Sequence, residues 1–208
     1  MTQRTVHLAV YDTLADWEYG HAVAQLRDST YHRDPAGFDV VTVGATLDPV
    51  TSMGGLRILP DLALADLSPA DSALLLLPGA SAWDSDPERL APFARTARAF
   101  LGAGVPVAAI CGATAGLARE GLLDDRDHTG PAADYLAATG YAGAARYREA
   151  DAVTDGDLIT ASPTAPVAFA REVLGRLEVY TPEMLHAWYR LFAHSDPSAF
   201  AAVGEGAA

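Results

Sequence analysis

The chain has 208 residues, of which 14 are basic and 27 are acidic, so its formal net charge at pH 7 is −13. This negative charge repels nucleic acid and anionic membrane surfaces, and we expect neither as a partner. Half of the residues are hydrophobic, but no apolar run approaches the roughly 18 residues that a membrane-spanning helix needs.

Three features of the composition exclude particular chemistries. The sequence contains no lysine and no asparagine, which rules out a Schiff-base lysine, a lysine-containing phosphate loop and a Cys-His-Asn triad. The single cysteine, Cys111, excludes an internal disulfide and a cysteine-rich zinc site, and it suits a reducing compartment. We expect no metal and no cofactor. The first residues carry no secretory signal, so a cytoplasmic location is expected.

The organisation of the chain favours a single domain. No internal repeat and no linker rich in serine, glycine or proline divides it. We expect residues 1–181 to form the body of this domain, and residues 182–208 to add a C-terminal helix and tail that belong to it.

Hydrophobic patterning and turn residues predict strands that alternate with helices. The expected strands are 6–11, 39–43, 73–77, 105–110, a short segment near 126–129, and the hairpin pair 152–154 and 158–161. The expected helices are 14–26, 87–101, 113–120, 132–138, 166–177 and 182–192, and residues 51–60 form a small hairpin. This alternation predicts an α/β fold with a mainly parallel sheet covered on both faces. The apolar stripe of helix 182–192 is expected to pack on the core or on a second copy of the chain.

The most informative position is Cys111. It follows the apolar run 105–110 and precedes small residues that open the next helix, so it lies on a sharp turn from a strand into a helix. Such a turn is typical of a nucleophile elbow, where small neighbours accommodate a strained backbone close to the substrate. The start of a helix also favours a thiolate. The alternative is a cysteine that merely fills the core, as free cysteines often do.

Other residues are expected at the same edge of the sheet, because the carboxyl ends of parallel strands meet there. Glu18, near the start of the first helix, would share a proton with the Cys111 sulfur and act as a general acid or base. The backbone N–H groups of Gly79, Ala80 and Gly112 would stabilise an oxyanion. The alternative readings are an ordinary first-turn carboxylate and an ordinary turn glycine.

Several phrases of the sequence, taken in order, resemble the ThiJ/PfpI superfamily, and in particular its bacterial branch that is called glutamine amidotransferase-like or intracellular peptidase. The phrases are Asp16-Trp17-Glu18-Tyr19, Leu77-Pro78-Gly79-Ala80-Ser81-Ala82-Trp83, Ala109-Ile110-Cys111-Gly112-Ala113-Thr114, Gly121-Leu122-Leu123-Asp124 and His128-Thr129. The resemblance spans residues 5–177. It implies a flavodoxin-like three-layer α/β sandwich, commonly a homodimer, with Cys111 as nucleophile and Glu18 as its partner.

The sequence departs from this family pattern at three positions. Peptidase members have a histidine directly after the cysteine, where this chain has Gly112, so peptidase activity is not expected. Other members have a histidine after the next strand, and His128 is the candidate for a catalytic base here, although it could equally pair with a surface carboxylate. Ala80 replaces the second glycine that usually follows the proline.

Two functions from different classes remain open on the sequence. The first is an enzyme, a hydrolase or hydratase, in which the Cys111 thiolate attacks an electrophilic carbon of a small molecule such as a reactive carbonyl, an amide or an isonitrile. The second is a redox-sensing stress-response protein in which Cys111 is oxidised to a sulfinic acid that protonated Glu18 stabilises. A catalytically silent dimeric scaffold is the third reading.

Overall fold

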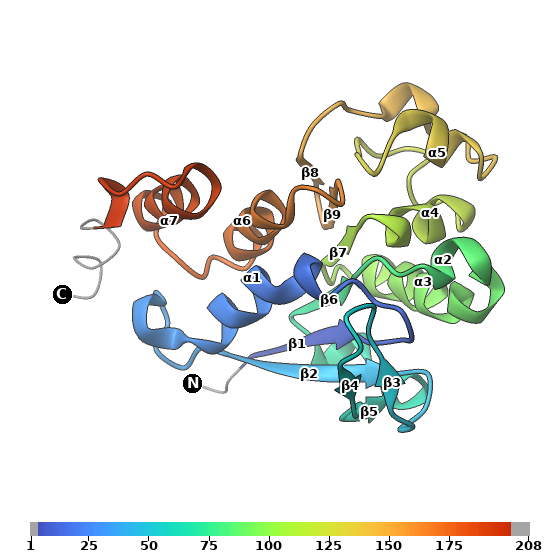
Figure 1. Cartoon of the computed structure of the whole chain (residues 1–208), viewed down its shortest axis with the longest axis horizontal. Coiled ribbons are helices and arrows are strands. Elements are labelled where there is room, and N and C mark those ends of the chain that lie inside the picture. The colour runs from blue at the N-terminus through green and yellow to red at the C-terminus, as the bar shows by residue number, and fades with distance from the viewer. Residues whose placement is uncertain (1–3, 201–208) are drawn as a thin grey trace.

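A seven-stranded sheet forms the centre of the protein, whose computed structural model describes residues 4–200 (Figure 1). Its strands are β1 (Arg4–Ala9), β2 (Phe38–Gly44), β5 (Leu62–Ala63), β6 (Leu74–Leu77), β7 (Val107–Ile110), β8 (Ala152–Asp155) and β9 (Leu158–Ala161). The spatial order is β5-β2-β1-β6-β7-β9-β8, and every pair is parallel except β8 with β9. The order reverses between β1 and β6, which is where open α/β sheets of this kind bind ligands.

Helices cover both faces of the sheet and make a three-layer, flavodoxin-like sandwich (Figure 1). One face carries α1 (Asp16–Arg27), α6 (Pro166–Arg176) and α7 (Pro182–His194); the other carries α2 (Ala82–Ser85), α3 (Pro87–Gly102) and α4 (Gly112–Arg119), with α5 (Ala133–Ala137) packed on α4. The 3-10 helices are η1 (Ser29–Tyr31), η2 (Leu64–Asp66), η3 (Pro69–Asp71) and η4 (Ala144–Arg146). A separate antiparallel hairpin pairs β3 (Val50–Thr51) with β4 (Arg57–Ile58).

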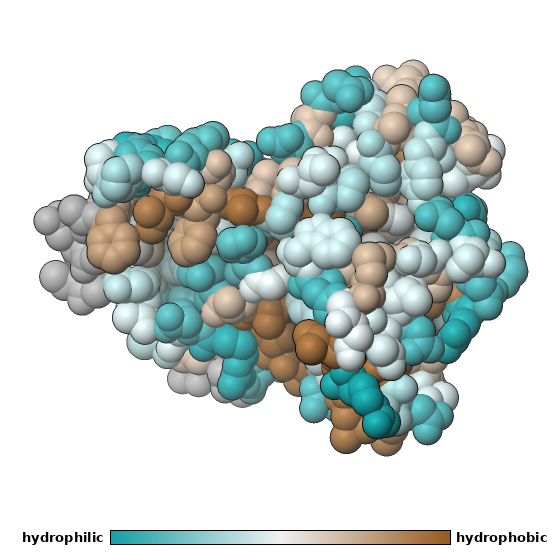
Figure 2. All heavy atoms as spheres, viewed as in Figure 1, coloured by the Kyte–Doolittle hydropathy of each residue, from teal (hydrophilic) through white to brown (hydrophobic). Residues whose placement is uncertain are grey.

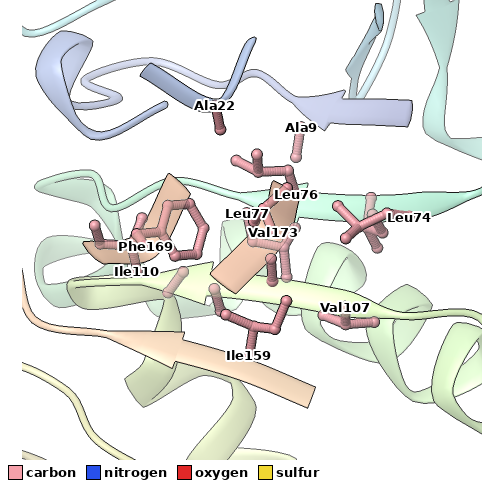
Figure 3. Packing of buried hydrophobic residues seen from close by; sticks show 14 of the residues in the cluster. Ala9, Ala22, Leu74, Leu76, Leu77, Val107, Ile110, Ile159, Phe169 and Val173 are labelled. Carbon is pink, nitrogen blue, oxygen red and sulfur yellow. The ribbon is translucent and has the colours of Figure 1, made fainter. Parts of the chain in front are cut away.

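The central strands are apolar on both faces because helices cover both sides of the sheet. All four leucines of β6 and all four residues of β7 are fully buried. Figure 3 shows Phe169 and Val173 of α6 against these strands. This rigid layer fixes the positions of the loops at its carboxyl edge.

The structure confirms the predicted α/β class and most of the predicted elements, and it differs in informative places. Residues 126–129 form no strand: His128 makes a single bridge to Tyr147, because β8 already occupies that edge of the sheet. The first helix begins at Asp16 rather than at Leu14, because Leu14 pairs with Ala80 in an isolated bridge. The elements β5 and α2 were not predicted, since two to four residues carry no usable periodicity.

Helix α7 packs on α6, and its apolar stripe is partly used for that contact. Met184 and Trp188 are buried, whereas Phe192 stays exposed. Figure 2 shows hydrophobic surface, in brown, over the region of α7. The tail expected for the end of the chain lies outside the described residues from 201 onward. Between residues 4 and 200, none of the helices has the length and apolarity required to cross a membrane.

Helix α4 lies close to Trp83 because two glycines face the indole. A Cβ at Gly116 would lie 2.3 Å from Cζ3 of Trp83, and one at Gly112 would lie 3.1 Å from its Cβ. Trp83 is fully buried, and its Nε1 donates hydrogen bonds to Pro78 O and to Tyr11 Oη, both at 3.2 Å. The indole therefore has little freedom to move away from α4.

We expect Gly116→Ala to lower the free energy of unfolding by about 1–3 kcal/mol, because overpacking against Trp83 outweighs the helix propensity that alanine adds. Gly20→Ala is the matched control, since a Cβ at Gly20 in α1 meets nothing within 4 Å. That change should raise the free energy of unfolding by about 0.5–1 kcal/mol. Urea unfolding of both variants measures the difference, and equal stabilities would contradict the packing described.

Candidate active site

The backbone of Cys111 adopts the strained turn that the sequence predicts. Its φ is +58° and its ψ is −131°, a conformation that L residues rarely adopt and that costs about 1–3 kcal/mol. Three hydrogen bonds hold it: Cys111 N donates to Ala161 O at 3.0 Å, and the N–H and hydroxyl of Thr114 donate to Cys111 O at 3.0 and 2.6 Å. Cys111 is partly exposed and packs against the buried core cluster, so it lies at the rim of the core where β7 ends.

Glu18 brings a carboxyl group to the same place from α1. The residue is fully buried, and its Oε2 accepts a hydrogen bond of 2.5 Å from the N–H of Gly79. The Gly79 carbonyl in turn accepts from Ala15 N at 2.9 Å, which ties the start of α1 to the loop after β6. Glu18 Oε1 is buried and has no hydrogen-bond partner among the described residues.

Gly79 is the point at which the carboxyl and the thiol meet. A Cβ at this position would lie 2.7 Å from Cys111 Cβ, 3.0 Å from Cys111 Sγ and 2.8 Å from Glu18 Oε2. No real Cβ tolerates such contacts, so only glycine fits between the two side chains. The structure thus brings together Cys111, Glu18 and Gly79, as the sequence predicts.

Burial controls the protonation of this pair. Removal from water raises the pKa of Glu18 to about 7, although hydrogen bonds from Gly79 and Cys111 partly stabilise its ionised form. Burial, followed by the nearby charge of Glu18, raises the pKa of the Cys111 thiol to about 12, while the N–H of Gly112 opposes this rise. At neutral pH the resting pair therefore holds a thiol, and its acid is poised to exchange a proton.

The backbone N–H groups of Gly112 and Ala80 are the candidates for binding an oxygen atom of a substrate. Gly112 is the first residue of α4, so its N–H has no acceptor inside the helix. The N–H of Ala80 makes no hydrogen bond within residues 4–200. A Cβ at Gly112 would lie 3.4 Å from Ala80 O, which places the two residues side by side. The N–H of Gly79, in contrast, is already donated to Glu18.

His128 is fully buried, and both of its ring nitrogens have partners away from the cysteine. Nδ1 lies 2.8 Å from Arg126 O, and Nε2 lies 3.0 Å from the hydroxyl oxygen of Tyr141. Tyr141 and Tyr147 pack edge-on against the ring, and burial lowers the pKa of His128. The imidazole thus has no free nitrogen to offer Cys111, and its contacts hold the 126–147 region together.

Two further residues, Tyr11 and Trp83, support the site without being among the residues predicted for it. Tyr11 donates its hydroxyl to Pro78 O, and the Trp83 indole donates to the same carbonyl, so together they fix the loop that presents Gly79. A signal for Trp83 was present, because it ends the phrase that begins at Leu77. Its contact with the glycines of α4 could not be read from the sequence.

The donor set near the cysteine gives no indication of a metal centre. Within the described part of the chain, no group of three or more histidine, cysteine, aspartate or glutamate side chains could hold a metal ion.

Comparisons with known proteins identify the family of the chain. A model of the DJ-1/PfpI family matches residues 4–176. The protein named "Uncharacterized protease YoaZ" of Bacillus subtilis (strain 168) is 40% identical over 203 residues, 96% of each chain. A thiJ/pfpI family protein from Bacillus anthracis has a TM-score of 0.93 and 40% identity, covering 99% of this chain and 98% of its own. The DJ-1 superfamily protein Atu0886 from Agrobacterium tumefaciens has a TM-score of 0.82 and 35% identity, covering 94% of this chain and 99% of its own. The chain therefore belongs to the DJ-1/PfpI family.

Proposed function

We propose that the protein is a cysteine-dependent enzyme that hydrolyses or hydrates small molecules, with Cys111 as the nucleophile and Glu18 as its proton partner. The observation that carries the proposal is the meeting of a strained, partly exposed cysteine with a buried carboxyl group at Gly79. A carboxyl whose pKa is raised to about 7 accepts and returns a proton near neutral pH, as a general acid and base must.

The proposed hydrolysis runs in two steps. Ionised Glu18 takes the thiol proton as the sulfur bonds to the carbonyl carbon, and the N–H groups of Ala80 and Gly112 stabilise the oxyanion. Glu18 then gives its proton to the leaving group, and a thioester remains on Cys111. A water molecule attacks the thioester, loses a proton to Glu18, and releases the acid while the thiol is restored.

Two features of the site favour a small molecule over a polypeptide substrate, although relatives are named as proteases. Gly112 follows the cysteine, where the expected peptidase pattern has a histidine. His128 has both ring nitrogens engaged, so it is not placed to take over that role. We therefore assign the proposed reaction to Cys111 and Glu18, without a histidine.

Replacing the nucleophile tests the proposal directly. We expect Cys111→Ser and Cys111→Ala to lose turnover of every substrate that the wild type accepts from a panel of small amides, esters, reactive carbonyls and isonitriles, because no second nucleophilic sulfur exists in the chain. Circular dichroism checks that both variants stay folded. Turnover at the wild-type rate in either variant would refute the proposed nucleophile.

The pH profile tests the role of Glu18. Because the proposed base must be ionised, kcat/KM should rise about tenfold per pH unit below the raised pKa of about 7 and level off above it. Glu18→Gln should remove this rising limb and lower kcat/KM by about 10²–10⁴.

His128→Asn is the control for that profile, because it removes the imidazole while leaving Glu18 in place. It should lower the thermal midpoint, since the bonds to Arg126 O and Tyr141 are weakened, yet leave the rising limb at the same pH. If the rise of kcat/KM with pH is lost in His128→Asn but kept in Glu18→Gln, the proton transfer belongs to the histidine instead.

A second candidate function is redox sensing through Cys111. The supporting observation is that a protonated Glu18, with an unpartnered buried Oε1, lies beside a partly exposed sulfur and could donate a hydrogen bond to a sulfinate oxygen. Oxidation consumes two hydrogen peroxide molecules, adds two oxygen atoms to the sulfur and releases two water molecules.

Mild peroxide treatment followed by intact-mass measurement separates the two functions. Sensing predicts a gain of two oxygen atoms confined to Cys111. In Glu18→Gln, the same treatment should oxidise a larger fraction of the protein to the sulfonic acid. If no small molecule is turned over and this gain is seen, sensing is favoured. A cysteine that stays unmodified rejects sensing.

A further inference from the structure

A hydrogen bond between two side chains that the proposed mechanism does not use joins two helices that pack on α4, the helix that follows Cys111. The hydroxyl of Tyr135, in α5, donates to Asp84 Oδ1, in α2, at 2.7 Å. Figure 1 shows α4 between these two helices. The bond thus connects α2 with α5 beside the helix whose first turn follows Cys111.

Packing on either side places this bond close to the elbow. Trp83, the neighbour of Asp84, packs on Gly112 and Gly116 of α4. Leu136, the neighbour of Tyr135, packs against Gly130, and a Cβ at Gly130 would lie 2.8 Å from Thr114 Oγ1. Thr114 is the residue whose hydroxyl donates to the Cys111 carbonyl.

Electrostatics agrees with this placement. The charge of Asp84 is among the causes that raise the pKa of Cys111, and the charge of Cys111 is among those that raise the pKa of Tyr135. Burial is the largest cause at Tyr135, so its phenol stays neutral. The charges of Asp84 and Tyr135 thus interact with that of the sulfur, in agreement with their place on helices that pack on α4.

The direction of the hydrogen bond decides what the pair can recognise. Because the Tyr135 hydroxyl gives its only proton to Asp84, the phenol oxygen offers lone pairs alone to any other partner. Asp84 is exposed, and its carboxylate also only accepts. The backbone N–H groups of Ala80 and Gly112, in contrast, only donate.

We propose that Tyr135, held by Asp84, is a specificity-determining residue that accepts a hydrogen bond from an N–H group on the reacting carbon of the substrate, so that the site selects carboxamide-type compounds over esters and aldehydes. The carbonyl oxygen of such a group faces the two N–H donors, and its nitrogen faces Tyr135. Negative charge from Glu18 and Asp84 disfavours anionic substrates. This inference rests on the proposed function, because it needs Cys111 as the nucleophile.

Two chemically matched probes test the inference without requiring turnover. 4-Nitrophenyl carbamate and 4-nitrophenyl acetate share a leaving group and differ only by NH₂ in place of CH₃ on the reacting carbon. Attack by Cys111 forms the S–C bond and releases 4-nitrophenolate, which is followed as a burst, and intact mass verifies acylation of the one cysteine. Each rate is divided by that of N-acetylcysteine.

The wild type should prefer the carbamate, and Tyr135→Phe should reduce the carbamate-to-acetate ratio about tenfold, the usual effect of one hydrogen bond. Asp84→Ala should reduce it similarly, because the freed hydroxyl can then turn and donate. Asp84→Asn should keep most of the preference, because its Oδ1 still accepts from the phenol. The control is Tyr189→Phe in α7, which removes a phenol oxygen distant from the site and should leave the ratio unchanged.

An unchanged ratio in Tyr135→Phe, or a wild-type ratio equal to that of the free thiol, would overturn the inference. If both probes still acylate Cys111 in that case, the proposed function stands without it. Failure of both probes to acylate Cys111 would overturn the inference and the proposed function together.

Discussion

The missing side chain of Gly79 is the constraint on which the site depends. The carboxyl of Glu18 and the sulfur of Cys111 occupy the space where a Cβ would lie, and the N–H of the same residue holds the carboxyl at 2.5 Å. Three segments that are far apart in sequence, after β1, β6 and β7, therefore meet at one backbone position. The sheet makes this meeting possible because these three strands are neighbours and end at the same edge.

This arrangement is costly to the folded protein in two ways. Cys111 has a positive φ that its hydrogen bonds with Ala161 and Thr114 maintain. Glu18 is buried, so it binds its proton more tightly in the folded chain than in the unfolded chain. The stability that its neutral form provides is present at low pH and is lost as the pH rises from 4.5 toward about 7. Such local destabilisation is common at sites that perform chemistry.

Much of the fold and of the candidate site could be predicted from the sequence. The apolar run before Cys111 and the small residues after it define the elbow locally, and the alternation of strands and helices sets which loops share an edge. Glu18 follows from its place near the start of the first helix. What could not be predicted depends on side-chain direction. The ring of His128 points to Arg126 O and Tyr141, a choice made by tertiary packing. The donation of the Gly79 N–H to Glu18 is likewise a contact across 61 residues.

The proposed substrate site has hydrogen-bond donors on one side of Cys111 and hydrogen-bond acceptors on the other, and this difference would select among substrates. On one side, the N–H groups of Ala80 and Gly112 are fixed by the backbone, so they need no reorganisation to meet a developing negative charge. On the other side, Tyr135 and Asp84 present only acceptors, because the single phenolic proton is already used between them. A substrate that satisfies both sides must carry an acceptor and a donor on the same carbon. A carboxamide does so, whereas an ester leaves one side unpaired, and a buried or half-buried polar group without a partner costs more than the missing bond itself.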